Sequence, residues 1–218
     1  MKRNKNSGIF LTDKKQGIIF ICFLSLLLLL TLPLCTLPAP PAGSEIKIPA
    51  QYLGSGYLIC RHGNAMLSEM IRQQNITDKR FSHIGILTRH KGKFYVIHAD
   101  TNRSSISGLV KKEPLDDFLK EAGRIGIFRS RILDGRRIAA DAEQFVDRPF
   151  DWKFNMENDQ EIYCTELLYH IFKNNGKAQV LPLIRIENHR LIPIDACITG
   201  AAATELYDSG SRKRRTNF

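Results

Sequence analysis

Residues 81–99, FSHIGILTRHKGKFYVIHA, decide the fold that this chain can adopt. Residues 81–89 and 93–99 are rich in β-branched and aromatic residues, and the short segment HKG separates them. Two such runs joined by a short connection that contains glycine are typical of a β-hairpin. We therefore expect at least part of the sheet to be antiparallel.

The segments on both sides of this hairpin show strand and helix patterns. Pro114 and Gly123 stand at the two ends of one helix pattern, where proline and glycine are favoured. Strands are predicted at residues 56–61 and 124–130, and helices at residues 64–74, 114–123, 134–148 and 164–175. The turn-rich residues 180–210 are expected to wrap the core. This order predicts an α+β domain with helices against one face of a small, mainly antiparallel sheet.

The 218 residues divide into one domain and two charged or apolar ends. With 43% hydrophobic and 25% charged residues, the composition is that of an ordinary globular protein. We expect the domain at residues 51–210. The other predicted parts are a basic region at 1–16, a hydrophobic segment at 17–35, a proline-rich linker at 36–50 and a basic tail at 211–218.

Residues 17–35 carry no charge and follow five Lys or Arg residues and Asp13. This is the pattern of a signal peptide or of a membrane anchor, with the basic flank in the cytoplasm and the domain outside it. The apolar run is longer than that of a usual signal peptide, so we favour a retained transmembrane helix over a cleaved signal. Cys35 ends the run as in a lipoprotein signal, but Leu34 is large where a small residue is expected.

The formal net charge of +10 lies mostly at the two ends of the chain. Residues 1–16 and 211–218 contribute +4 each, which leaves +2 for the residues between them. The basic balance therefore does not point to nucleic acid as a partner. A tail of this kind can touch an anionic surface, and its alternative is a solvated end.

Two histidines lie on the predicted hairpin strands, His83 and His98. A hairpin that is symmetric about the bond between residues 90 and 91 places them directly opposite each other, with Leu87 opposite Phe94. The other residues of that face are apolar, so both histidines interrupt a stripe that faces the core. They are either core histidines with satisfied hydrogen bonds or members of a site.

Cys164 begins the predicted helix 164–175. The spacing of the apolar residues in this helix places Cys164 on the face that packs against the sheet. Unpaired N–H groups and the helix dipole at a first turn lower the pKa of a thiol. If this end of the helix adjoins His83 and His98, the three residues form a nucleophile, a base and an orienting group. The backbone N–H of Cys164 would then donate to an oxyanion. The alternative is a small, unreactive core residue.

The other cysteines of the domain, Cys60 and Cys197, either pair or remain free, because spacing alone does not show whether they are close. His62 lies two residues after Cys60, and we do not expect these two residues to form a second Cys/His pair. The sequence has no cluster with the spacing of metal ligands. We therefore expect neither a metal nor another cofactor.

The segments FSHIGI, YVIHA and YCTELL together resemble the permuted papain-fold amidases, the YaeF/YiiX-like branch of the NlpC superfamily of cysteine hydrolases. The resemblance covers roughly residues 53–175. It implies a permuted papain-like domain in which Cys164 is the nucleophile, His83 the general base and His98 the orienting residue. In this family an acidic residue usually stands where His98 stands, and the opening strand usually reads GDL instead of GYL.

The resemblance implies attack on an amide or ester carbonyl and a thioester intermediate on Cys164. A hydrolase of the cell envelope acting on a peptide or amide is the favoured interpretation. A lipid-acting acyltransferase or esterase and a non-catalytic binding module are the alternatives. Tyr163, Trp152 and Phe154 are candidates to line a pocket, although aromatic residues at such positions also serve packing alone.

Overall fold

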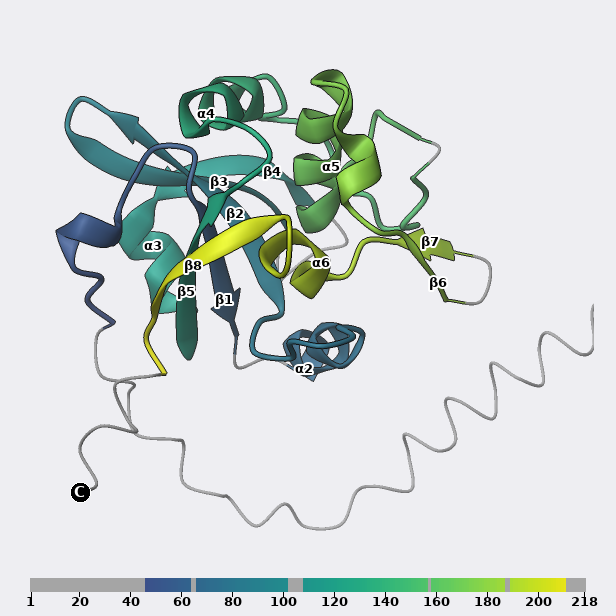
Figure 1. Cartoon of the computed structure of the whole chain (residues 1–218), viewed down its shortest axis with the longest axis horizontal. Helices are drawn as coiled ribbons and strands as arrows, with labels where there is room; N and C mark the ends of the chain where they lie inside the picture. Colours follow the sequence, from purple (N-terminus) through teal and green to yellow (C-terminus); the bar gives the residue numbers. More distant parts are fainter. Residues whose placement is uncertain (1–45, 64–65, 102–107, 157, 187–188, 211–218) are drawn as a thin grey trace, which may run out of the picture. The chain divides into compact units, whose positions relative to one another are not determined.

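The computed structural model describes residues 46–63, 66–101, 108–156, 158–186 and 189–210 (Figure 1). The predicted basic region, the hydrophobic segment 17–35 and the basic tail 211–218 lie outside these residues. No helix in the described part of the chain is long and apolar enough to cross a membrane. The described residues all belong to one compact unit, which begins at Gly43.

A six-stranded antiparallel sheet forms the middle of this unit, with the strand order β4-β3-β2-β1-β5-β8 (Figure 1). The predicted antiparallel sheet is thus confirmed. The strands are β1 (Leu58–His62), β2 (His83–His90), β3 (Lys93–Thr101), β4 (Gly108–Pro114), β5 (Arg124–Ser130) and β8 (Ala203–Asp208).

The helices connect these strands and cover the sheet. They are α2 (Met66–Gln73), α3 (Leu115–Lys120), α4 (Gly135–Glu143), α5 (Cys164–Asn174) and α6 (Ile194–Ile198), with short 3-10 turns at Ala50–Tyr52 and Ala178–Val180. A separate two-stranded ribbon, β6 (Ile184–Ile186) and β7 (His189–Leu191), follows α5. The predicted helix 164–175 is confirmed. It ends at Asn174, with Asn175 as the C-cap residue, and Gly176 follows with a φ of +68°.

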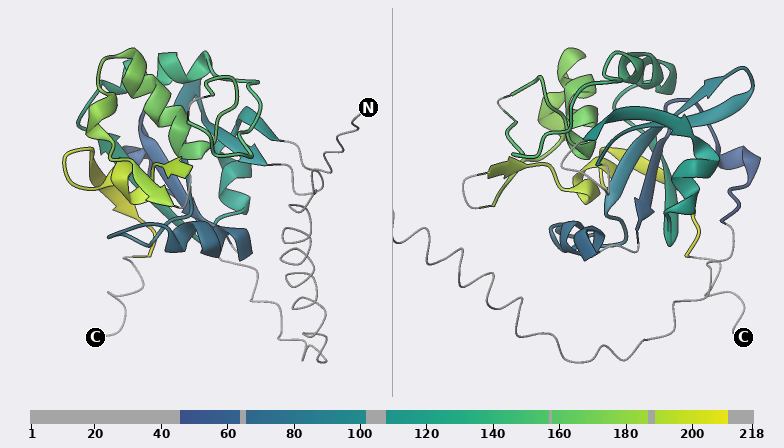
Figure 2. Two further views of the ribbon diagram at one scale, coloured as in Figure 1. Left: turned by 90° about the vertical axis from the view of Figure 1, so that its right-hand side faces the viewer. Right: turned by 180° about the vertical axis from the view of Figure 1, so that it is seen from behind.

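Helices cover both faces of the sheet, so the prediction of helices on one face only was wrong. On the first face, Leu58, Cys60 and Ile86 belong to the core that includes α4 and α5. On the second face, Ile59 and Leu87 pack with Phe118 of α3. The views in Figure 2 show α4 and α5 together on one side of the sheet and α3 on the other.

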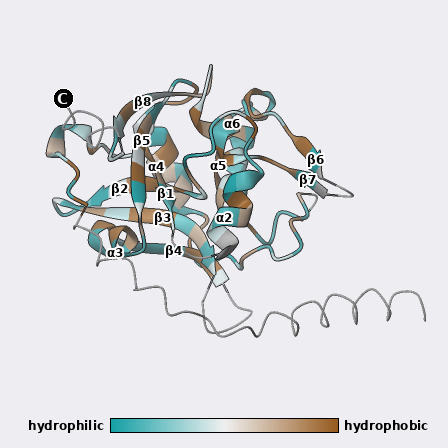
Figure 3. Ribbon diagram, turned by 90° about the horizontal axis from the view of Figure 1, so that it is seen from below, coloured by the Kyte–Doolittle hydropathy of each residue, from teal (hydrophilic) through white to brown (hydrophobic). Residues whose placement is uncertain are grey.

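The physical reason is the nearly continuous apolar sequence of the central strands. Because successive strand residues point to opposite faces, a run such as residues 58–60 or 84–87 must be covered on both faces. Figure 3 shows apolar stretches in the strands and in α5, as expected for elements with buried faces. Ile46 and Ile48, which precede β1, also pack against the second core.

The hairpin turn lies one residue later than predicted. His90 pairs with Lys93, so the turn consists of Lys91 and Gly92, whose φ angles are +48° and +81°. A two-residue hairpin turn needs positive φ at both positions, and glycine favours the second. Leu87 therefore lies opposite Val96 instead of Phe94. The shift moves each partner by two positions, which leaves every side chain on its predicted face.

Two strands of the six-stranded sheet were not predicted. β4 has the sequence GLVKKEP, which is poor in strong strand formers, and it pairs with β3 over its whole length. β8 lies in the segment that we expected to wrap the core, and it forms the edge of the sheet beside β5. Both are edge strands, where charged residues are common.

Candidate active site

The site contains a hydrogen-bonded row of three side chains on β2, β3 and β4. The Nε2 atom of His83 lies 2.7 Å from Nδ1 of His98. The Nε2 atom of His98 lies 2.8 Å from Oε1 of Glu113. We predicted that His98 lies directly opposite His83. Instead, His98 is a diagonal neighbour of His83 on the same face of the sheet. A Cβ atom at Gly85, one residue beyond the last β2–β3 pair, would come within 3.1 Å of the His98 Cβ.

The two imidazoles lie against α3 on the second face of the sheet. The side chain of His98 is fully buried, and the ring of Phe118 lies 5.1 Å from that of His98 and 6.0 Å from that of His83. Burial lowers the pKa of His83 well below 6.5, and the charge of Arg61 lowers it further. Burial also lowers the pKa of His98, although the hydrogen bond to Glu113 opposes this change. Both histidines are therefore neutral at pH 7.

Charged side chains surround the pair on the same face. Lys111 Nζ lies 2.9 Å from Asp100 and 3.1 Å from Glu113, and Arg61 lies 3.4 Å from Asp100. Burial raises the pKa of both carboxyl groups. The nearby histidines and Lys111 outweigh it, so the pKa of each stays below its usual range. Asp100 and Glu113 are therefore ionised at pH 7.

Cys164 is the first residue of α5 and is partly buried. The backbone N–H of the preceding Tyr163 donates to Glu166, which fixes the start of the helix. Burial raises the pKa of the Cys164 thiol to about 11, and hydrogen bonds from the N–H groups of Ile84 and Thr165 oppose this rise. The expectation of a lowered thiol pKa was thus wrong, because burial outweighs the helix terminus.

A split in the sheet brings Cys164 close to the residue that follows His83, although Cys164 packs on the first face of the sheet and His83 lies on the second. β2 pairs with β1 as far as His83, whereas its pairing with β3 stops at Ile86. The N–H of Ile84, the residue after His83, is instead close to the Cys164 sulfur. None of the hydrogen bonds between described residues joins Cys164 directly to His83.

The predicted oxyanion donor is the backbone N–H of the first residue of α5. The N–H of Cys164 is at the first turn of α5, where helix N–H groups have no partner within the helix. Such a group adjacent to a nucleophile can donate to the oxygen that becomes negative during attack.

The three predicted pocket residues belong to one aromatic row that leads away from Cys164. The ring of Tyr163 lies 5.2 Å from that of Phe154, which lies 6.3 Å from that of Phe150. The Phe150 ring lies 5.1 Å from that of Trp152. Tyr163 is buried, whereas Trp152 is 41% exposed. The row therefore extends from the residue that precedes Cys164 to the surface.

Three residues of the site have the composition of a metal site, although the sequence spacing did not indicate one. One ligand atom each of His83, His98 and Asp100 lies within 4.8 Å of the others. However, Nε2 of His83 and Nδ1 of His98 already bond to each other. A metal ion would have to replace that bond. We call the hydrogen-bonded row of His83, His98 and Glu113 the histidine relay.

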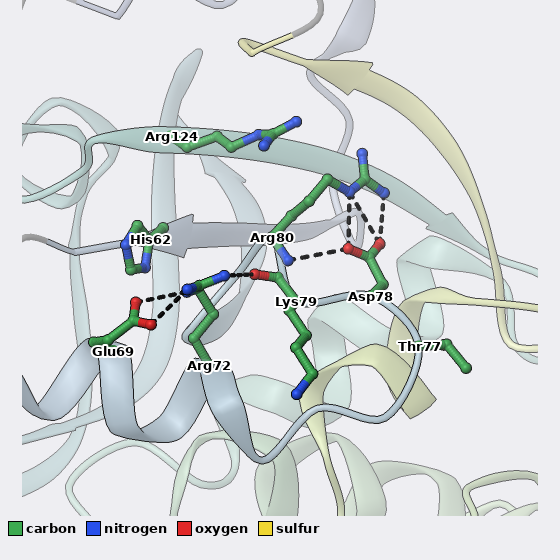
Figure 4. A pocket seen from close by; sticks show the side chains of 8 residues that line it. All are labelled: His62, Glu69, Arg72, Thr77, Asp78, Lys79, Arg80 and Arg124. Carbon is green, nitrogen blue, oxygen red and sulfur yellow. Dashed lines mark hydrogen bonds and ion pairs between the residues drawn. The ribbon is translucent and has the colours of Figure 1, made fainter.

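The remaining candidates lie apart from this relay. Cys60, Cys164 and Cys197 are all free thiols, so the alternative of a disulfide between Cys60 and Cys197 is not realised. His62 lines a different pocket of about 460 Å³ beside α2 (Figure 4). Four charged groups of that pocket form two pairs, Arg72 with Glu69 at 2.5 Å and Arg80 with Asp78 at 2.6 Å.

Sequence reasoning did not find Glu113 and Asp100. Asp100 follows His98 by two positions, so the two share a strand face. Glu113 and Lys111 show the same spacing on β4. The alternation of Lys111, Lys112 and Glu113 is visible in the sequence. Because no strand was predicted at residues 108–114, there was no reason to place Lys111 and Glu113 beside the histidines.

Comparisons with known proteins agree with this fold. The family model of the permuted papain-like amidase enzymes (YaeF/YiiX, C92 family) matches residues 52–189. The chain is similar in fold to a crystal structure described as the metalloprotein yiiX from Escherichia coli O157:H7. The TM-score is 0.60 at 18% sequence identity, and the match covers 72% of this chain and 98% of that chain. No curated protein matches the chain.

Proposed function

Because the chain belongs to the permuted papain-like amidases of the YaeF/YiiX, C92 family, we propose that it cleaves an amide bond with Cys164 as the nucleophile and His83 as the base. The observation that carries the proposal is the relay of His83, His98 and Glu113 beside the start of α5. A thiol at a helix terminus with an imidazole as its base is an arrangement that cysteine hydrolases use.

The proposed reaction starts from a neutral thiol and a neutral imidazole. Nδ1 of His83 accepts the thiol proton as the Cys164 sulfur attacks the carbonyl carbon, and the N–H of Cys164 donates to the oxyanion. The C–N bond then breaks, and His83 gives its proton to the leaving amine. A water molecule gives a proton to His83 and attacks the thioester. The C–S bond breaks, and the thiol recovers that proton as the carboxylic acid leaves.

A second candidate is an esterase or acyltransferase that acts on an acyl lipid with the same two residues. The aromatic row from Tyr163 to the exposed Trp152 favours it, because a row of rings can bind an acyl chain next to the nucleophile. Transfer to an added amine, detected as an acyl amide product, distinguishes an acyltransferase from a hydrolase.

We propose that the domain works outside the cytoplasmic membrane, held by the hydrophobic segment 17–35. The basic residues 1–16 before this segment support the orientation. If the full chain sediments with membranes and a chain that lacks residues 1–42 does not, the proposal holds. If both remain in the supernatant, the segment is not an anchor.

The test of the reaction compares amide and ester substrates of increasing acyl length with the full-length chain in detergent. We expect hydrolysis by the wild type and none above background by Cys164→Ala. His83→Ala should be about 10²–10⁴-fold slower than the wild type. If Cys164→Ala retains the hydrolysis, the proposed nucleophile is wrong.

A further inference from the structure

We propose that Glu113 is the positioning residue of this site: its carboxylate fixes the tautomers of His98 and His83, so that Nδ1 of His83 is the free base facing Cys164. The proposal rests on the proposed function of Cys164 and His83. It starts from two distances, 2.8 Å between Glu113 and His98 and 2.7 Å between His98 and His83.

The first step concerns the proton between Glu113 and His98. An ionised carboxylate only accepts hydrogen bonds, so the proton of this contact is on Nε2 of His98. Lys111 holds the other oxygen of Glu113 at 3.1 Å, which favours the ionised form. A neutral imidazole has one N–H group, so Nδ1 of His98 carries no proton and accepts.

The second step follows from the bond between the histidines. Because Nδ1 of His98 accepts, Nε2 of His83 must donate. The proton of a neutral His83 is then on Nε2, and its Nδ1 carries a free lone pair. That nitrogen is the one that the relay leaves for the thiol. One carboxylate on β4 thus determines the state of a base two strands away.

Other charged groups around the histidines do not replace Glu113. Asp100 lies 4.0 Å from Nδ1 of His98, which is beyond a hydrogen bond, and it is held by Lys111 and Arg61. Arg61 also binds Glu121 and lies over the ring of Phe118. Neither cation has a lone pair with which to accept the His98 proton.

The position of Glu113 also accounts for the departure from the family pattern. The resemblance implies an acidic residue at the position of His98. Here a second imidazole occupies that position, and the acid stands one hydrogen bond further away, on β4. The relay therefore keeps a negative end that stabilises the imidazolium formed during attack.

The test has a spectroscopic and a kinetic part, both with the full-length chain labelled with ¹⁵N-histidine. At pH 7 the wild type should show His83 and His98 as Nε2–H tautomers. In Glu113→Gln the amide can donate to Nε2 of His98, so both histidines should change to Nδ1–H tautomers. The substrate turnover of Glu113→Gln should fall by roughly 10²-fold.

Two further variants separate positioning from folding. Glu113→Asp keeps an acceptor-only group, so it should retain the wild-type tautomers and recover turnover at least in part. Glu143→Gln removes a carboxylate that pairs with Lys112, the neighbour of Glu113 whose side chain lies on the opposite face of β4. This control should change neither the tautomers nor the turnover.

The outcomes for Glu113 and for the enzyme are distinct. Nδ1–H tautomers in the wild type, or Nε2–H tautomers that persist in Glu113→Gln, would overturn the role of Glu113. Full turnover by Glu113→Gln would do the same. Wild-type tautomers as expected with no hydrolysis of any substrate would support the role of Glu113 and reject the proposed reaction.

Discussion

At the residue scale, the site combines a partly buried thiol with a partly buried imidazole, and the loss of solvent around them opposes ionisation of both. The pKa of Cys164 is raised to about 11 and that of His83 is lowered. A resting pair of thiolate and imidazolium would need the reverse order of pKa values. The neutral pair is therefore the resting state, and in the proposed reaction the proton moves during attack on the substrate.

This state predicts how Cys164 reacts with iodoacetamide at different pH. The thiolate is the reactive form, so alkylation should be slow at pH 7. Its rate should rise with pH and be half-maximal near the pKa of about 11. Mass spectrometry of the peptide that contains Cys164 measures the rate. A midpoint at or below that of an ordinary thiol would show that the thiolate is already formed at rest.

The acid side of the activity profile follows from His83. A histidine acts as a base only when neutral, which is above its pKa in the folded protein. Because that pKa is lowered below 6.5, activity should be complete at pH 6.5 and fall only at lower pH. Measuring kcat/KM from pH 4 to 8 checks this. A fall that begins above pH 7 would mean that His83 is charged in the resting enzyme.

At the element scale, the β2–β3 hairpin places the two histidines, and two of its glycines have different tasks. A Cβ atom at Gly85 would meet Val96 at 2.5 Å and His98 at 3.1 Å, whereas one at Gly92 meets nothing within 4 Å. Gly92 instead needs its φ of +81° for the turn. Gly85 thus serves the site, and Gly92 serves the turn.

Gly85→Ala should displace His98 and reduce kcat/KM on the order of 10²-fold, because small displacements in a site are costly. Gly92→Ala is the matched control: it should lower the free energy of unfolding by about 1 kcal/mol and leave kcat/KM nearly unchanged. Denaturant unfolding and kinetics of both variants measure this. Equal kcat/KM values for the two variants would contradict the assigned positions.

A second element-scale feature is the tie between α6 and the loop after α2. The Oδ2 atom of Asp195 accepts from the N–H groups of Ile76, Thr77 and Asp78 at 2.6–3.2 Å. Asp195 is buried, so these bonds contribute more than exposed ones do. They hold the loop that leads from α2 to β2, the strand of His83.

Asp195→Asn should destabilise the protein by about 1–3 kcal/mol and increase hydrogen exchange at residues 76–78. Asp134→Asn is a suitable control, since Asp134 caps α4 through one N–H group and asparagine caps equally well. Unchanged exchange at residues 76–78 in Asp195→Asn would mean that the loop does not depend on this carboxylate.

The elements that the sequence could predict are those with strong local patterns. The apolar period of residues 164–175 predicted a helix that begins at the cysteine, and the alternation in the hairpin predicted the shared face of His83 and His98. The predicted turn position was wrong by one residue. The shared face of the two histidines was still correct, because this error shifts each cross-strand partner by two residues. Glu113 could not be predicted, because its strand is visible only through pairing with β3.

At the scale of the whole molecule, the sheet separates two cores, and the candidate site lies where β2 parts from β3. Cys164 belongs to the core of α4 and α5, and the histidines lie against α3 in the other. No local sequence pattern could indicate this meeting of two cores, since it depends on where strand pairing stops. The resemblance of the quoted motifs to the permuted amidases anticipated it, and the family match to residues 52–189 confirms that resemblance.

The central claim is that Cys164 forms a thioester with help from His83. The most direct measurement is the intact mass and peptide map of the full-length chain after brief reaction with a p-nitrophenyl acyl ester. We predict one acyl group on Cys164, sensitive to hydroxylamine, absent in Cys164→Ala and formed far more slowly in His83→Ala. An acyl group on Cys60 or Cys197, or acylation of Cys164 at the same rate without His83, would contradict the account.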